Sequence, residues 1–137
     1  MKKTLIVIDM QNDFIDGSLG TAEAVKIVPN VRKKIEEYRS NGDEIIFTRD
    51  THGEDYLSTP EGKKLPVVHC VKNTHGWQIA DGLDVPDAIH IDKPSFGYTH
   101  WDKFCFEKIE LVGLCTDICV VSNALILKAL FPNAEIS

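Results

Sequence analysis

Three features are scarce or absent in this sequence, and each excludes a class of protein. No uncharged apolar run approaches the roughly 20 residues of a membrane-spanning helix, although 43% of the residues are hydrophobic. Positive charge is scarce: the net charge is −6, and the one dense basic run, 32–34, is followed at once by Glu36 and Glu37. Because no run is long enough to span a membrane, we expect no membrane partner. Because phosphate binding requires clustered Lys and Arg, we expect no nucleic-acid partner. Repeats and interdomain linkers are absent, and 137 residues suit one domain.

Cysteine is present but does not follow the pattern of small secreted proteins. The four cysteines are Cys70, Cys105, Cys115 and Cys119, and three of them lie in or beside apolar segments. The apolar stretch at the start is short and ends on Asp9, so we interpret it as a first strand and not as a signal peptide. Without an export signal, reduced thiols and a cytoplasmic location are expected.

Apolar runs and turn residues predict strands that alternate with helices. Strands are expected at 5–8, 44–48, 87–91 and 109–113, helices from Pro29 to about 41 and from 116 to about 130, and loops at 11–20 and 50–66. This alternation implies parallel crossovers, and therefore a three-layer α/β/α sandwich around a mainly parallel sheet. Because 133–137 reads as the opening of another strand, we expect a single domain, 1–137, that lacks its last strand and helix.

Reactive side chains are expected at the carboxyl ends of the strands, where ligands bind in parallel α/β sheets. The sequence meets this expectation at Asp9, at Asp50 with His52, at Lys93, and in the turn 115–119. A carboxylate, an ammonium group and a thiol at three strand ends form a constellation suited to acyl transfer. This distribution is the main argument from the residues themselves for an enzyme.

Cys119 is the candidate nucleophile. It lies about three residues into the expected helix, where unpaired backbone N–H groups and the helix dipole favour a thiolate. The same N–H groups are suited to hold a tetrahedral oxyanion. The alternatives are a buried structural cysteine and a redox pair with Cys115, although that spacing differs from the usual two-residue separation of such pairs.

A metal site is suggested by Asp50, His52 and His69. Asp50 and His52 are two positions apart, so an extended segment turns both side chains to one side, and His69 follows a loop. One carboxylate and two imidazoles suit zinc, iron or manganese and leave positions open for water or substrate. The alternative is that these side chains only make hydrogen bonds within loops.

Taken together, the motifs resemble the isochorismatase-like cysteine hydrolases, and among them the nicotinamidase branch. The matching segments follow the family's order: 5–14 (LIVIDMQNDF), 48–52 (TRDTH), 92–93 (DK) and 112–120 (VGLCTDICV), with 74–77 (THGW) similar to the same branch. The resemblance implies a Rossmann-like fold and a catalytic triad. In that triad Asp9 takes the thiol proton, Lys93 holds the charged pair in position, and Cys119 attacks a small amide, most of all nicotinamide, to form a thioester.

The resemblance also implies how the site is completed. The backbone N–H groups of Cys115 and Cys119 would form the oxyanion hole, with a cis peptide at 114–115 and a cysteine where the family commonly has alanine. A divalent metal, zinc first with iron or manganese as alternatives, would bind Asp50, His52 and His69. His75 is a weaker ligand candidate.

Phe14 and Trp77 are expected to form the pocket wall against an aromatic ring, with simple packing as the alternative. Members of the family commonly self-associate, so a homo-oligomer is expected. Three other functions stay open: hydrolysis of a different small amide, a non-catalytic binding domain, and a thiol redox domain. Non-catalytic members tend to lose the triad, whereas this chain keeps all three positions.

Overall fold

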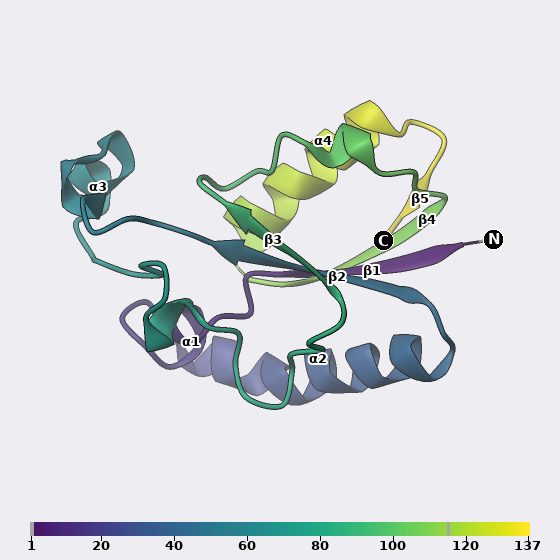
Figure 1. Cartoon of the computed structure of the whole chain (residues 1–137), viewed down its shortest axis with the longest axis horizontal. Coiled ribbons are helices and arrows are strands. Elements are labelled where there is room, and N and C mark those ends of the chain that lie inside the picture. Colours follow the sequence, from purple (N-terminus) through teal and green to yellow (C-terminus); the bar gives the residue numbers. More distant parts are fainter. Residues whose placement is uncertain (1, 115) are drawn as a thin grey trace.

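The structure is a computed structural model that describes residues 2–114 and 116–137. Within these residues, five strands form one parallel sheet in the order β3-β2-β1-β4-β5 (Figure 1). The strands are β1 (Lys3–Ile8), β2 (Glu44–Asp50), β3 (Ile89–Lys93), β4 (Lys108–Gly113) and β5 (Glu135–Ile136). The expected parallel sheet is therefore confirmed.

Helices cover both faces of the sheet, with α2 on one side and α4 on the other (Figure 1). The α-helices are α1 (Asn12–Ile15), α2 (Ala22–Ser40), α3 (Pro60–Lys64) and α4 (Val121–Leu130), and a π-helical turn (Thr116–Val120) leads into α4. Short 3₁₀ turns occupy Tyr56–Ser58, His75–Trp77 and Trp101–Lys103. Among the described helices, none is both long enough and apolar enough to span a membrane.

The core is divided between the two faces by the alternation of side chains along β1. Leu5 and Val7 pack in the cluster that contains the buried face of α2, whereas Ile6 and Ile8 pack in the cluster that contains Leu127 of α4. All four β1 side chains are fully buried. A continuous apolar run is what a strand covered on both faces requires, and the three-layer sandwich is confirmed.

Helix α2 begins earlier than its sequence predicts. The Thr21 side chain accepts a hydrogen bond from the N–H of Ala24 at 3.0 Å and caps the helix, while exposed Pro29 lies inside it. A proline costs the helix one internal hydrogen bond, but the buried stripe that includes Val31 and Ile35 holds the helix against the sheet. The prediction that this helix begins at Pro29 is therefore wrong.

The carboxyl ends of β1, β2 and β3 meet at one edge of the sheet. Asp50 and Lys93 are the last residues of β2 and β3 and are paired in register, and Asp9 follows β1 directly. Strand β3 runs two residues later than expected, which makes Lys93 part of the strand. The segment 50–66, expected to be a loop, carries a 3₁₀ turn and α3. The predicted gathering of reactive side chains at strand ends is present.

Candidate active site

Asp9 and Lys93 form a buried ion pair at this edge of the sheet. The Lys93 Nζ atom lies 2.7 Å from Asp9 Oδ2, and both side chains are completely excluded from solvent. The Thr48 hydroxyl donates to Asp9 Oδ1 at 2.7 Å. Asp9 has a φ of 51°, a conformation uncommon for residues other than glycine and found repeatedly at functional sites. The backbone thus aims this carboxylate into the interior.

The environment of the pair keeps Asp9 able to accept a proton. Burial raises the pKa of Asp9, and the Lys93 charge offsets this rise only in part. Burial alone would lower the pKa of Lys93, but the negative charge of Asp9 holds it above its ordinary value. Within the described part of the chain, Asp9 Oδ2 has no hydrogen bond of regular geometry besides its ion pair with Lys93.

Cys119 lies in the π-helical turn just before α4, and its side chain is 3% exposed. Burial, followed by the negative charge of Asp9, raises the pKa of the Cys119 thiol, and the opposing effect of Lys93 is smaller. The expectation that the start of the helix favours a thiolate here therefore differs from the structure. The regular helix α4 begins only at Val121, and burial of Cys119 outweighs any effect of the helix start on the pKa of its thiol.

The remaining expectations for this turn involve Cys115, which lies outside the described residues. They are its N–H group in the oxyanion hole, the cis peptide at 114–115, and the redox pair with Cys119. The first two stay predictions, and the redox pair stays an alternative. Cys70 and Cys119 are free thiols buried in the protein, and Cys105 is a free thiol at the surface.

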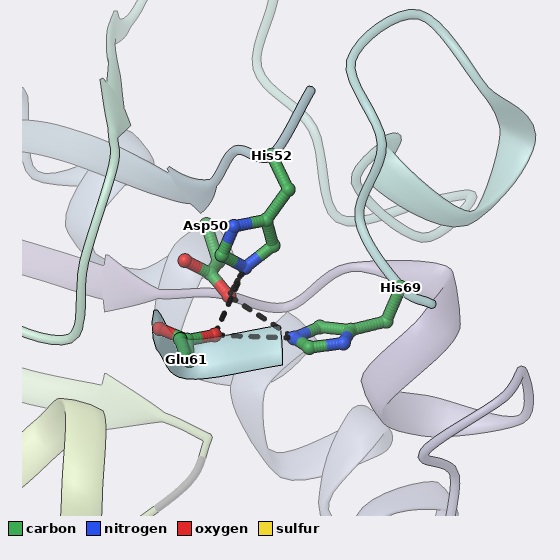
Figure 2. Close-up of side chains that lie close together, drawn as sticks. All are labelled: Asp50, His52, Glu61 and His69. Carbon is green, nitrogen blue, oxygen red and sulfur yellow. Dashed lines mark hydrogen bonds and ion pairs between the residues drawn. The ribbon is translucent and has the colours of Figure 1, made fainter. Parts of the chain in front are cut away.

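The three predicted metal ligands lie together, and Glu61 joins them. Ligand atoms of Asp50, His52, Glu61 and His69 all lie within 4.8 Å of one another. The Nε2 atoms of His52 and His69 are 3.0 and 3.5 Å from Asp50 Oδ2, and Glu61 Oε2 is 3.3 Å from His52 Nε2. Figure 2 shows the two carboxylates and two imidazoles pointing toward one another.

Glu61 was missed by reasoning from sequence. It is carried by α3, which Thr59 caps by accepting from the N–H of Gly62 at 3.0 Å. Threonine followed by Pro60 is a signal for the start of a helix, so α3 itself could have been found. The direction of Glu61 could not, because it depends on where the chain that leaves β2 places α3.

The donor set fits a divalent metal. Asp50 Oδ1 and Glu61 Oε2 are buried and have no hydrogen-bond partner among the described residues. The Nδ1–H group of His69 donates to the carbonyl of Val67 at 2.7 Å, and this contact turns the Nε2 atom toward the centre of the site. Burial raises the pKa of Asp50, but hydrogen bonds from His52 and His69 outweigh it and hold that pKa well below its usual range. Two carboxylates and two imidazoles suit such a cation.

Two further polar side chains hold these ligands in place. Gln11 is completely buried, and its amide bonds both backbone groups of Asp50, donating to the carbonyl at 2.9 Å and accepting from the N–H at 2.8 Å. Asp13 accepts from the N–H of Cys70 at 2.8 Å and so fixes the segment that carries His69. These contacts join residues 39 and 57 positions apart, so sequence spacing contains no signal for them.

A cavity of about 70 Å³ lies between the metal ligands and Cys119. It is lined by Phe14, Leu19, Asp50, Glu61, Leu65, His69, Phe96, Ile118 and Cys119. Phe14 thus lies where its sequence predicts. Trp77 is not in this lining; it packs with Phe14 and Cys70, donates to the Thr51 hydroxyl at 2.9 Å, and lies under the Arg49 guanidinium at 4.2 Å. Contact between Trp77 and a substrate stays a prediction.

Known proteins of similar sequence and fold contain this arrangement of strands. The chain is 33% identical to a nicotinamidase of Saccharomyces cerevisiae in an alignment of length 173, gaps included. The alignment covers 90% of this chain and 80% of the relative. The structure of a pyrazinamidase of Pyrococcus horikoshii in complex with zinc is similar, with a TM-score of 0.82, 30% identity, and coverage of 95% of this chain and 80% of that one.

An N-carbamoylsarcosine amidase from Thermoplasma acidophilum is also similar, with a TM-score of 0.81, 28% identity, and coverage of 99% and 80% of the two chains. A family model described as the isochorismatase domain matches residues 3–130 of this chain. That match spans the sheet edge, the triad positions and the four candidate metal ligands. The chain therefore belongs to the isochorismatase family.

Proposed function

We propose that this protein is a metal-dependent cysteine amidase that hydrolyses a small aromatic amide, nicotinamide first, to the acid and ammonia. The observation that carries the proposal is the cavity that joins Cys119 to the candidate metal ligands. Its remaining lining is apolar, with Phe14 and Phe96 among it. Such a site suits a flat ring that has a metal-binding atom on one side and a carbonyl group on the other.

The chemistry we propose uses the buried ion pair to activate the thiol. Asp9 accepts the proton of Cys119, and the sulfur attacks the amide carbon to form a tetrahedral adduct. The proton passes from Asp9 to the amide nitrogen, the C–N bond breaks, and ammonia leaves a thioester on Cys119. Water then attacks the thioester while Asp9 takes one of its protons, and the acid and the free thiol are restored. Lys93 stays charged throughout and holds Asp9 in position.

Asp50, His52, Glu61 and His69 would hold the metal, with zinc as the first choice. When bound, the metal supplies an electrophilic anchor for a ring nitrogen. The two carboxylates of the set balance the charge of a divalent cation, so the neutral substrate meets a site without net charge. The zinc complex of the similar Pyrococcus horikoshii pyrazinamidase supports this choice.

The test is ammonia release from nicotinamide by the zinc-loaded protein. We expect release that is abolished by Cys119→Ala, reduced by a metal chelator, and unchanged by Cys105→Ala, which removes an exposed thiol. No release from folded, zinc-loaded protein would refute nicotinamide as the substrate. Pyrazinamide and N-carbamoylsarcosine would then test the alternative of a different small amide, which the similarity to the Thermoplasma acidophilum amidase favours.

A further inference from the structure

Asn123, the third residue of α4, uses its whole hydrogen-bonding capacity inside the protein. Its side chain is completely buried. The Oδ1 atom accepts from the N–H of Tyr98 at 2.8 Å and from the Trp101 indole N–H at 3.0 Å. The Nδ2 group donates to the carbonyls of Cys119 at 2.8 Å and Phe96 at 3.1 Å. Two acceptor and two donor positions are therefore all filled, which is the maximum for an asparagine.

Two of these partners belong to residues that line the cavity. Cys119 lies in the π-helical turn, and the Asn123 amide bonds its carbonyl directly. Phe96 lies on the segment that follows Lys93, and its carbonyl is held by the same amide group. Phe96 and Cys119 both line the cavity. One side chain thus connects the backbone of the candidate nucleophile to the backbone of Phe96 in the cavity wall.

The π-helical turn that contains Cys119 receives support from Asn123. Turns of this type are rare and occur frequently at functional sites. The turn lies immediately before α4, and the Asn123 side chain bonds it from the first turn of that helix. A buried asparagine that only filled space would lose more by desolvation than an apolar residue of its size.

We infer that Asn123 is a positioning residue that sets the separation between the Cys119 sulfur and the pocket wall formed by Phe96. The inference rests on the proposed function, in which Cys119 is the nucleophile. It makes a statement of its own, because Asn123 touches neither substrate nor the reacting atoms. Its action is through the Cys119 turn on one side and the segment 96–101 on the other.

Two variants at this position separate the two contacts. Asn123→Asp keeps the shape of the side chain and the acceptor Oδ1. It replaces the Nδ2 group, which donates to the Cys119 and Phe96 carbonyls, by an acceptor oxygen, so both contacts become repulsive. Asn123→Thr keeps a hydroxyl that can bond the Cys119 carbonyl four residues earlier but is too short for the segment 96–101. Leu127→Ala is the matched control, because it removes a fully buried side chain from the same helix without touching either contact.

The experiment measures kcat and KM for ammonia release, and the rate at which iodoacetamide alkylates Cys119 as located by tandem mass spectrometry. For Asn123→Asp we expect kcat to fall roughly 10- to 100-fold, since small misplacements of a reacting group have that effect. Alkylation should become faster, because the loosened turn exposes a buried thiol. For Asn123→Thr we expect a raised KM with kcat largely retained. Leu127→Ala should change none of these values per folded molecule.

Asn123→Asp and Leu127→Ala with equal kcat and equal alkylation rates would overturn the inference, because Asn123 would then be a core residue only. If Asn123→Asp does not fold, the kinetics of Asn123→Thr test the inference instead. A loss of kcat in Asn123→Thr as large as its rise in KM would overturn the inference. Failure of the amidase function gives a different result. The wild type would then release no ammonia, while faster alkylation in Asn123→Asp would persist and uphold the positioning of the turn.

Discussion

The side chain of Cys119 is buried near the negative charge of Asp9, and both features favour the protonated thiol. Burial and the negative charge of Asp9 raise its pKa, so nucleophilic attack needs a proton acceptor close by. Burial raises the pKa of Asp9 as well, and this makes Asp9 a better base than an exposed carboxylate. The buried charge of Lys93 opposes this rise and favours the ionised form of Asp9, which the proposed mechanism uses as the base.

Asp9→Asn is expected to have opposite effects on thiol reactivity and on turnover. Without the negative charge of Asp9, the pKa of the Cys119 thiol falls, so the thiolate fraction at neutral pH and the alkylation rate both rise. Ammonia release should fall roughly 10²- to 10⁴-fold, because the base is lost. Alkylation and ammonia release, each followed between about pH 6 and pH 9, provide the measurement.

In the wild type, the raised pKa predicts alkylation of Cys119 that increases with pH throughout that range without levelling off. The control is Asp16→Asn, which removes an exposed carboxylate from the same part of the chain and should change neither rate. Slower alkylation in Asp9→Asn would contradict the assignment of Asp9 as the group that raises the thiol pKa.

Glu61 provides a second prediction for a single side chain. Glu61→Gln removes one of the two carboxylates near the two imidazoles, so zinc affinity should fall by at least the roughly 10- to 100-fold that loss of an outer-shell partner causes. Competition for zinc with a chromogenic chelator measures this affinity. Glu54→Gln, at an exposed position of the same segment, is the matched control. Equal affinities of the two variants would remove Glu61 from the ligand set.

Among the elements, the end of β4 determines how the chain approaches the site. Gly113 has a φ of 130°, and a Cβ atom there would overlap the backbone of Ile8 on β1. The next N–H, of Leu114, donates to the Ile8 carbonyl at 3.0 Å. Glycine is required because the chain lies against β1 where it leaves β4, shortly before the π-helical turn that contains Cys119.

Gly113→Ala should therefore destabilise the protein by more than about 3 kcal/mol, through the unfavourable φ and the overlap with Ile8 together. Gly42→Ala is the control: its φ of 71° is also positive, but a Cβ atom there meets nothing within 4 Å, so about 1 kcal/mol is expected. Urea unfolding measures both. Equal losses would show that the close approach of β4 to β1 is not what requires glycine.

The elements also show where local sequence signals reach their limit. The strands were predictable because buried parallel strands are continuous apolar runs bounded by turn residues. Helix α2 was placed too late, since a proline signals a first turn locally while the buried stripe that begins at Ala24 extends the helix around it. Helix α3 is only five residues long, and its role depends on Glu61 reaching His52 across the end of β2.

Across the whole molecule, the candidate metal site connects segments that are far apart in the chain. Asp50 and His52 come from the end of β2, Glu61 from α3, and His69 from the loop that follows it. A cation bound there would join all three segments in the folded state only. Metal binding is therefore coupled to folding stability.

Zinc should raise the melting temperature of the metal-free protein, and a chelator should reverse the rise. At a zinc concentration of 1,000 Kd the stabilisation amounts to about 4 kcal/mol for one site. Thermal unfolding followed by circular dichroism measures it. His69→Ala should abolish the zinc-dependent rise, whereas His75→Ala, which changes an exposed histidine, should keep it. A rise that persists in His69→Ala would place the zinc elsewhere. Homo-oligomerisation and a cytoplasmic location stay predictions.

The sequence by itself determined the fold class, and it indicated the strand-end positions of the predicted triad and three of the four candidate metal ligands. It could do so because burial on both faces leaves continuous apolar runs, and parallel strands bring the residues after them to one edge. Only the tertiary structure decided the direction of Glu61, the support from Gln11 and Asn123, and the burial that raises the pKa of Cys119. These depend on contacts between distant segments and on desolvation inside the folded core, and neither quantity is a property of local sequence.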